Sequence, residues 1–398
     1  MKYLLHSSLL IFLFLCSPVQ IQAQLQNANK FASLTVSLQS NLPLPPDSLN
    51  YNYIVTLYRV DSPETLPVTL VLDTGRGLTL TQTCGGQFHS SPVKCDGVEC
   101  LEFFKDQWKS PKLPTSGQVC KQSRSHMCNY TLARDQQVLN TGTLSKVNLI
   151  VNGTDMIPDF VFGCGQNTPA APDLFGKSVD GVLGLGRDSN LSFLSQTNNI
   201  YQSFCFAYCL PSNSSSIGYL TFGKNNIHDN SKTLLFTPFS PNNKSHYVVD
   251  IVAITVGKTR LPIEYQSNIR GAVIESGEKF TRLPPKAYVM VRDEFKQQMG
   301  TKYTAAKAFS ILDTCYDTTK HASITAPPMS FTFGNNMTVQ LDVSGILYEV
   351  NSTLKCFAFA PTSYPGDLAI FASTQQRTLR MVFDVANWRL GIGNNGCP

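Results

Sequence analysis

The sequence predicts an all-β protein, because short runs rich in β-branched and aromatic residues recur along it and turn residues separate them. These runs are 53–58, 68–72, 147–151, 160–162, 247–256, 272–274, 346–350 and 381–385. Helical periodicity is scarce. The best helix candidate is Pro285–Met299, which can place Val289, Phe295 and Met299 on one face.

Residues 1–23 have the pattern of a secretory signal peptide. Lys2 supplies a positive charge, Leu9 to Cys16 is apolar, and Ile21 to Ala23 is a suitable cleavage sequence. The apolar run is far shorter than the roughly 20 residues that a membrane-spanning helix needs. The sequence therefore predicts a secreted protein of the extracellular space or cell wall, with no membrane span.

Charge and length restrict the function further. The chain has 398 residues, 32 basic and 27 acidic, a formal net charge of +5 and 42% hydrophobic residues. A mild positive charge without runs of like charge does not predict nucleic-acid binding, and it only weakly favours acidic polymers such as pectic wall material. The length and the low charge density predict a large core in about two domains, divided near Thr237 to His246, where proline and asparagine interrupt the strand pattern.

The cysteines and sequons are typical of the secretory route. Of 12 cysteines, Cys16 lies in the predicted signal, and the remaining eleven predict up to five disulfides and one thiol. No cysteine pair has the spacing and the nearby histidines of a zinc site, so no metal or other cofactor is predicted. Asn-x-Ser/Thr sequons predict glycosylated surface loops at Asn129, Asn152, Asn190, Asn213, Asn243, Asn336 and Asn351.

Two pentapeptides, Val71 to Gly75 and Val273 to Gly277, share the pattern apolar, apolar, acid, hydroxyl, glycine. A later apolar run follows each of them, ending at Gly184 in the first half and at Ala372 in the second. The repeated order predicts a duplicated lobe. Two acids that share one proton can activate water to attack an amide, which makes Asp73 and Glu275 the candidate catalytic pair.

These motifs resemble those of plant pepsin-like aspartic peptidases of the nepenthesin-like branch. The other segments that carry the resemblance are Phe162 to Gly165, Gly181 to Arg187, Tyr208 to Pro211, Asp313 to Tyr316 and Cys356 to Cys397. The resemblance covers nearly the whole mature chain. It implies a bilobal pepsin-like fold with few short helices, with lobes over 24–240 and 241–398 and a substrate cleft between them. The fold is also similar to that of secreted plant proteins that lost proteolysis and inhibit microbial cell-wall hydrolases.

The resemblance assigns Asp73 to the first catalytic aspartate and places Glu275 where the second should stand. The extra methylene moves the carboxylate about 1.5 Å outward, more than a site positioned to within about half an ångström tolerates. An alternative is that Glu275 is a buried acid that only holds its loop. The other motif residues match the family pattern: Thr74, Gly75, Ser276 and Gly277. In the family the hydroxyls at the positions of Thr74 and Ser276 brace the two loops.

Family members have serine or threonine directly after each motif, but this chain has Arg76 and Glu278. An arginine next to Asp73 would favour its ionised form and oppose a shared proton. We therefore expect Arg76 to pair with Asp73, Glu275 or Glu278. The alternative is an arginine that points into solvent.

The flap and the second apolar run also depart from the family pattern. Arg134-Asp135-Gln136 stands where the family has Tyr-Gly-Asp, so the tyrosine that covers the substrate is missing. Tyr130 is interpreted as a packing residue and not as its replacement. Ala372 replaces a glycine at a close backbone approach. Only about thirty residues separate the signal from the first strand, so we expect no family-type prosegment.

Disulfide expectations are limited to a few cysteines. We expect Cys95 to pair with Cys100 and Cys315 to pair with Cys356. Altered pairing relative to the family is expected at Cys84 and Cys205.

The primary hypothesis is a secreted, proteolytically silent pepsin-like protein that binds or inhibits microbial glycoside hydrolases. The partner would be a protein or peptide, held in the cleft or by surface loops, and the protein is expected to be a monomer. The second hypothesis is an active aspartic endopeptidase that uses Asp73 and Glu275. The third is a storage or cell-wall structural protein.

Overall fold

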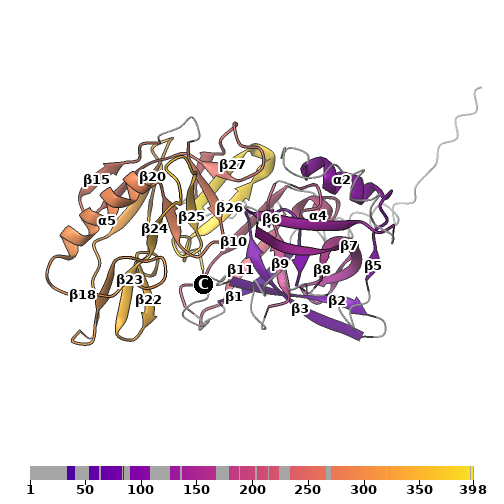
Figure 1. Cartoon of the computed structure of the whole chain (residues 1–398), viewed down its shortest axis with the longest axis horizontal. Coiled ribbons are helices and arrows are strands. Elements are labelled where there is room, and N and C mark those ends of the chain that lie inside the picture. Colours follow the sequence, from indigo (N-terminus) through magenta and orange to yellow (C-terminus); the bar gives the residue numbers. More distant parts are fainter. Residues whose placement is uncertain are drawn as a thin grey trace, which may run out of the picture.

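The computed structural model describes 34–40, 53–61, 64–82, 84, 90–107, 126–134, 137–166, 179–187, 189–201, 204–213, 215–223, 234–265, 270–321, 323–394 and 396–397. The predicted signal peptide lies outside these residues. Figure 1 shows two β-rich lobes side by side, with the first half of the sequence in one and most of the second half in the other. The all-β, bilobal prediction is confirmed.

The first half contains many strands and two short helices among its described residues. The strands are β1 (Leu34–Ser40), β2 (Tyr53–Asp61), β3 (Glu64–Asp73), β4 (Leu80–Thr81), β5 (Ser91–Pro92), β6 (Asn129–Arg134), β7 (Gln137–Val151), β8 (Asp155–Gly165), β9 (Gly181–Gly184), β10 (Cys205–Cys209), β11 (Gly218–Phe222) and β12 (Leu235–Pro238). The helices are α2 (Val98–Gln107) and α4 (Phe193–Tyr201).

The second half repeats this composition with shorter strands. Its strands are β13 (Val248–Val249), β14 (Ile251–Val256), β15 (Thr259–Pro262), β16 (Ala272–Glu275), β17 (Thr281–Leu283), β18 (Thr304–Ala306), β19 (Cys315–Asp317), β20 (Met329–Phe333), β21 (Thr338–Gln340), β22 (Leu347–Asn351), β23 (Leu354–Phe357), β24 (Phe359–Pro361), β25 (Ala369–Ala372), β26 (Arg380–Asp384) and β27 (Arg389–Gly393). Its helices are α5 (Pro285–Met299) and the 3₁₀ turns η2 (Val343–Gly345) and η3 (Val385–Asn387).

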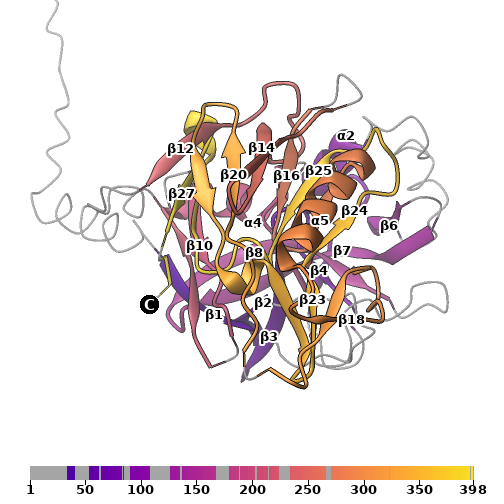
Figure 2. The same cartoon turned by 90° about the vertical axis from the view of Figure 1, so that its left-hand side faces the viewer.

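Helix α5 has the predicted bounds, but its buried face differs from the prediction. Phe295 and Met299 are buried as expected, whereas Val289 is 42% exposed and Val291 is fully buried. Val291 precedes Phe295 by four residues and therefore lies on the same face, whereas Val289 is displaced by two further residues, about 200° around the helix. Figure 2 shows α5 across the face of the second lobe, where it contacts β14, β17 and β24.

One sheet joins the two halves of the chain. Its strand order is β12-β27-β26-β10-β11-β1-β2-β3-β9-β4-β8-β7-β5, so β26 of the second half pairs directly with β10 of the first. The Phe206 and Phe383 rings of these strands stack with centroids 4.4 Å apart. The disulfide Cys209–Cys397 ties β10 to the C-terminal end as well.

The duplication extends to strand pairing. In the first lobe β3 runs parallel to β9, β9 pairs antiparallel with β4, and β4 runs parallel to β8. In the second lobe β16, β25, β17 and β24 are paired in the same senses and the same order. The two acid motifs therefore occupy equivalent places in two copies of one arrangement.

The disulfides partly follow the expectation. Cys315–Cys356 is confirmed, whereas the expected Cys95–Cys100 pair is wrong, because Cys100 pairs with Cys128. Cys100 lies on the inward face of α2 and is 1% exposed, so its thiol meets the small core that contains Cys128 instead of the preceding loop. Altered pairing was expected at two other cysteines. Cys84 forms a disulfide with Cys164, and Cys205 is a buried thiol.

Within the described ranges, no helix is long and apolar enough to cross a membrane.

Candidate functional site

The two acid motifs end equivalent strands. Asp73 is the last residue of β3 and lies opposite Gly184 of β9, and Glu275 is the last residue of β16 and lies opposite Ala372 of β25. Since both strand pairs are parallel, each acid is followed by a loop at the same end of its sheet.

A threonine hydroxyl six residues after each acid accepts a hydrogen bond from the residue that lies opposite that acid in the neighbouring strand. The Gly184 N–H donates to Thr79 Oγ1 at 3.1 Å, and the Ala372 N–H donates to Thr281 Oγ1 at 3.1 Å. The duplicated unit is therefore longer than the pentapeptide that reveals it in the sequence.

Thr74 and Ser276 brace the two loops against each other. The Thr74 N–H donates to Ser276 Oγ at 3.1 Å, and the Ser276 N–H donates to Thr74 Oγ1 at 3.0 Å. The hydroxyls then donate across the junction, Thr74 to the Ile274 carbonyl at 2.8 Å and Ser276 to the Leu72 carbonyl at 2.9 Å. Both side chains are buried, so these four bonds fix the relative position of the lobes at this point.

Each carboxylate lies against the glycine of the opposite loop. A Cβ added at Gly277 would be 2.7 Å from Asp73 Cγ, and a Cβ added at Gly75 would be 2.7 Å from Glu275 Oε1. A side chain at either glycine would therefore displace the carboxylate that lies against it. The structure thus brings Asp73, Gly75, Glu275 and Gly277 together at one junction.

Arg76 extends toward the first acid. Asp73, one of the three carboxylates expected as its partners, forms an ion pair with it, with Asp73 Oδ2 3.5 Å from Arg76 Nε. The other carboxylate oxygen of Asp73 accepts the Gly75 N–H at 2.8 Å. The Asp73 side chain is only 5% exposed, so this ion pair is shielded from bulk water on the Asp73 side.

Glu278, the equivalent of Arg76 in the second lobe, forms an ion pair with Arg282 of β17 at 3.7 Å. This contact lies within the second lobe. The two positions where the family has hydroxyls therefore carry side chains of opposite charge in different surroundings.

The first acid loop packs against two glycines of the following run. A Cβ at Gly184 would lie 2.4 Å from the Gly77 carbonyl oxygen, and a Cβ at Gly186 would lie 2.7 Å from the Arg76 carbonyl carbon. The Gly186 N–H donates to the Arg76 carbonyl at 2.7 Å. The absence of side chains on these glycines allows the two backbones to meet.

In the second lobe Ala372 and Thr374 stand at these two places, and the hydrogen bonds shift by one residue. The Thr374 N–H donates to the Lys279 carbonyl at 3.1 Å, one residue beyond the equivalent position, and the Glu278 carbonyl accepts the Ser373 N–H at 2.9 Å. The second lobe therefore has side chains, those of Ala372 and Thr374, where the first lobe has glycines, and the backbone contacts of its acid loop differ from those in the first lobe.

The flap is only partly described. Strand β6 ends at Arg134, whose side chain, together with Asp135 and Gln136, lies outside the described part of the chain. Tyr130 is 3% exposed, its hydroxyl donates to Asn140 Oδ1 at 2.6 Å, and its ring packs against Phe103. Tyr130 is therefore a packing residue.

Lys279 is a site residue that the sequence analysis missed. It follows Glu278 in the second acid loop, yet it is only 7% exposed, and its Nζ lies 4.5 Å from the centroid of the Tyr348 ring. Burial lowers the pKa of Lys279 to about 8, and the nearby positive charge of Arg377 acts in the same direction. A lysine directly behind an acid motif is the sequence signal that could have revealed it.

His246 is a second missed residue. It is half-buried just before β13, and burial lowers its pKa while the charge of Asp73 acts in the opposite direction. His246 therefore lies within electrostatic range of Asp73. No pattern in the sequence predicts this, because 173 positions separate the two residues.

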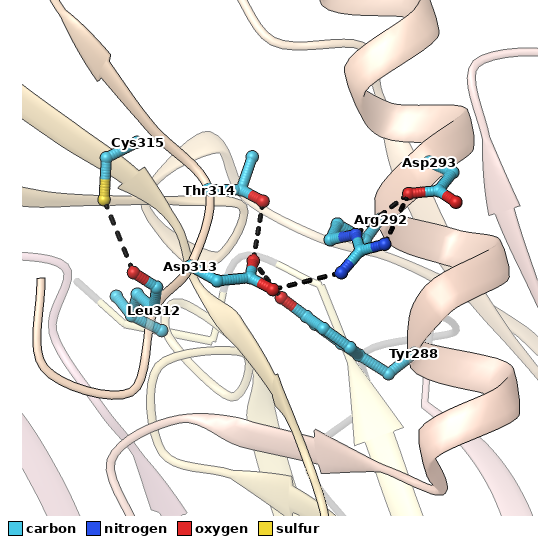
Figure 3. A network of polar contacts seen from close by, with 7 residues as sticks. All are labelled: Tyr288, Arg292, Asp293, Leu312, Asp313, Thr314 and Cys315. Carbon is cyan, nitrogen blue, oxygen red and sulfur yellow. Dashed lines mark hydrogen bonds and ion pairs between the residues drawn. The ribbon is translucent and has the colours of Figure 1, made fainter. Parts of the chain in front are cut away.

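A separate polar network holds α5 in the second lobe. Figure 3 shows Asp313 accepting hydrogen bonds from the Tyr288 hydroxyl at 2.5 Å, the Thr314 hydroxyl at 2.7 Å and Arg292 Nη1 at 3.1 Å. Burial raises the pKa of Tyr288, and the carboxylate of Asp313 raises it further. Asp313 thus anchors α5 to the loop that precedes the Cys315 disulfide.

In the described part of the chain, no group of three or more histidine, cysteine, aspartate and glutamate side chains could hold a metal ion.

Family models match both halves of the chain. The model described as xylanase inhibitor N-terminal matches residues 53–224, and the model described as xylanase inhibitor C-terminal matches residues 246–394. An aspartyl protease family protein from Arabidopsis thaliana is 38% identical over 365 residues, which is 87% of this chain and 72% of the relative.

Solved structures share the fold at low identity. Conglutin gamma, a basic 7S globulin from lupine seeds, has a TM-score of 0.70 and 18% identity, and the match covers 92% of this chain and 95% of that one. The aspartic proteinase from Irpex lacteus has a TM-score of 0.62 and 15% identity over 92% of this chain and 98% of that one.

Proposed function

We propose a function from the premise that this chain belongs to the plant family of pepsin-like aspartyl proteases, to which the xylanase inhibitor domains are related. Within that family we propose a secreted protein without significant proteolytic activity, which acts by binding and inhibiting microbial glycoside hydrolases. The observation that carries the proposal is the ion pair between Arg76 and Asp73.

An acid pair activates water by sharing a single proton between two carboxylates. A guanidinium is permanently charged, and Arg76 places this charge 3.5 Å from an oxygen of Asp73. A permanent positive charge beside one of two acids offsets the like-charge repulsion that makes such a pair share a proton. A pair arranged in this way is poorly suited to general acid and base catalysis on an amide.

The second loop supports the same conclusion. Glu275 carries a longer side chain than aspartate, and its carboxylate lies over Gly75. Ala372 and Thr374 replace the two glycines of the first lobe, and the backbone hydrogen bonds to the second acid loop are shifted by one residue relative to the first lobe. Because catalysis depends on positioning to within a fraction of an ångström, these changes act together with Arg76 against water activation.

The partner is inferred from the family models. Both halves of the chain match models described as xylanase inhibitor domains, which supports a glycoside hydrolase as the target. The brace between Thr74 and Ser276 is intact, so the two lobes keep a fixed relative position. A rigid two-lobed scaffold lowers the entropy cost of binding a protein partner through surface loops.

Secretion and glycosylation are part of the proposal. The predicted signal of residues 1–23 and the sequons support them, and Asn213 and Asn351 are exposed. Expression in a plant host should release a protein whose N-terminus follows Ala23 and whose mass falls on treatment with an N-glycosidase. Retention inside the cells would contradict this part of the proposal.

The decisive test combines two assays on the purified secreted protein. At acid pH we expect no cleavage of a denatured protein substrate above that of the Asp73→Ala variant. In a panel of microbial xylanases and other glycoside hydrolases, we expect saturable inhibition of at least one enzyme by both proteins. Cleavage that Asp73→Ala abolishes would overturn the proposal.

The alternative function is an active aspartic endopeptidase. Its support is the relative named as an aspartyl protease, together with the intact brace and the two carboxylates at one junction. In that case the assay at acid pH gives cleavage that depends on both Asp73 and Glu275. A storage or structural role would instead give neither cleavage nor inhibition.

A further inference from the structure

Arg187 ends the glycine-rich run of the first lobe and reaches an aromatic cluster supplied by the second half of the chain. Its guanidinium carbon lies 4.0 Å from the centroid of the Trp388 ring and 5.5 Å from the centroids of Phe239 and Tyr247. Trp388 is 40% exposed and Arg187 is half-buried. The stacked pair therefore lies at the surface where the two halves meet.

Arg389, the residue after Trp388, is also stacked on an aromatic ring, and it has a carboxylate partner as well. Its guanidinium carbon lies 4.1 Å from the Phe236 ring centroid, and its Nε donates to Asp384 Oδ2 at 2.7 Å. The Phe236 ring covers one face of the guanidinium, and the Asp384 carboxylate accepts a hydrogen bond from an N–H at its edge.

Arg292 repeats this arrangement on α5. It lies 5.5 Å from the Tyr288 ring centroid and forms ion pairs with Asp313 at 3.1 Å and Asp293 at 2.8 Å. Although burial acts to lower the pKa of Arg292, its bonds to the two carboxylates leave that pKa raised. Both of these stacked arginines are thus supplied with an acid by the chain itself.

Arg187 has the ring but no acid among the described residues. Its Nη1 is buried without a hydrogen-bond partner there, and none of the ion pairs in those ranges includes it. Burial lowers the pKa of Arg187, as expected for a cation without a neighbouring anion. A donor without an acceptor is unfavourable where it is buried, so the chain itself leaves this guanidinium incompletely satisfied.

Trp388 is held in a strained backbone conformation. Its φ is 52°, in the left-handed region, which is rare and strained for a bulky residue. The Trp388 carbonyl accepts the Phe239 N–H at 2.9 Å, which helps to hold this conformation and keeps the ring under Arg187. Strain of this kind is often found at sites that clamp a ligand.

We propose that Arg187 and Trp388 form a binding site for a carboxylate group from another molecule. The planar guanidinium presents two parallel N–H donors that match the two oxygens of a carboxylate, and the ring fixes the plane in which they are offered. The source is either a free small carboxylic acid or a uronic acid in a wall polymer. This site is distinct from the acid junction and does not depend on the proposed inhibitory function.

The test uses the emission of Trp388, one of only two tryptophans in the sequence. In a Trp108→Phe background, we expect acetate to change the Trp388 emission saturably relative to chloride at equal ionic strength. Galacturonate and trigalacturonate are titrated in the same way, and tighter binding of the trimer would identify a polymer as the source. Equal responses to acetate and chloride, or no saturable change with any carboxylate, would overturn the proposal.

Variants separate the site from general effects of ions. Arg187→Gln should weaken the response at least tenfold, whereas Arg389→Gln, a stacked arginine that already has its acid, should leave it unchanged. If Arg187→Gln does not fold, Arg187→Lys keeps the charge without the planar fork, and acetate should then raise the melting temperature of the parent but not of this variant. An unchanged response in the Arg187 variant that folds would contradict the assignment.

Discussion

Thr74 and Ser276 exchange backbone-to-hydroxyl hydrogen bonds across the lobe junction, although 202 positions separate them in the sequence. Each hydroxyl also donates to a carbonyl of the opposite strand. The arrangement is close to symmetric, as expected for two copies of one motif that meet face to face. It keeps the two acids at a common junction whether or not they catalyse a reaction.

Removing one hydroxyl from this brace should destabilise the protein strongly. Thr74→Val leaves the Ser276 N–H and the Ile274 carbonyl without their partner in a buried region, at a cost of about 2–4 kcal/mol. Urea unfolding measures this loss. The control is Thr304→Val on an exposed position of β18, where we expect a change below about 0.5 kcal/mol. Equal losses in the two variants would show that the brace adds no stability.

The strand runs and α5 could be predicted from the sequence because their patterns are local. The acid junction could also be predicted, since a motif that occurs twice in the same order indicates two copies of one unit. The error at Val289 arose from assigning a helix face without following the 100° step from Phe295 and Met299.

Other features depend on contacts between distant segments. The pairing of β26 with β10 and the Cys100–Cys128 disulfide join segments whose separation in sequence gives no register signal. Only the fold shows which aromatic rings Lys279 and Arg187 meet. For the same reason a resemblance to a family predicted Asp73 and Glu275 but not the ring beneath Arg187.

Restoring the second aspartate alone should not create a peptidase. In Glu275→Asp the carboxylate returns to the family length, but Arg76 still pairs with Asp73 and the second loop keeps its shifted contacts. We expect the cleavage of denatured substrate at acid pH to stay within twofold of the parent. Adding Asp73→Ala to the same variant is the control for contaminating proteases. Substantial cleavage that this addition removes would show that the length of Glu275 alone limits activity.

Replacing the buried lysine should stabilise the protein in a way that depends on pH. The pKa of Lys279 is about 8 in the fold and about 10.4 in the unfolded chain, so between these values the unfolded chain binds more protons and the stability of the parent rises with pH. Lys279→Met removes the penalty of the buried charge and should add about 1–3 kcal/mol at neutral pH. The gain should shrink as the pH rises from about 8 toward 10.4, which thermal melts across this range would measure.

Lys258→Met is the matched control, because Lys258 is exposed in the turn between β14 and β15. Its melting temperature should follow that of the parent at every pH. A stabilisation by Lys279→Met that does not vary with pH would mean that side-chain packing and not the buried charge is responsible.

The network at Asp313 should make the attachment of α5 sensitive to acid. Burial by itself would raise the pKa of Asp313, but hydrogen bonds from Tyr288, Thr314 and Arg292 outweigh it and leave the pKa below its ordinary value. A carboxyl whose pKa is lowered by folding contributes stability above its unfolded pKa, near 3.9, and loses that contribution as the pH falls through the folded pKa. Asp313→Asn should therefore lower the melting temperature at neutral pH by a few degrees, and the difference from the parent should close in strong acid.

Asp293→Asn is the control, because it removes an exposed partner of Arg292. It should change the melting temperature little at any pH, since exposed ion pairs contribute about 0–1 kcal/mol. If the two variants gave the same pH profile, the contribution assigned to Asp313 would belong to Arg292 and its exposed pairs instead.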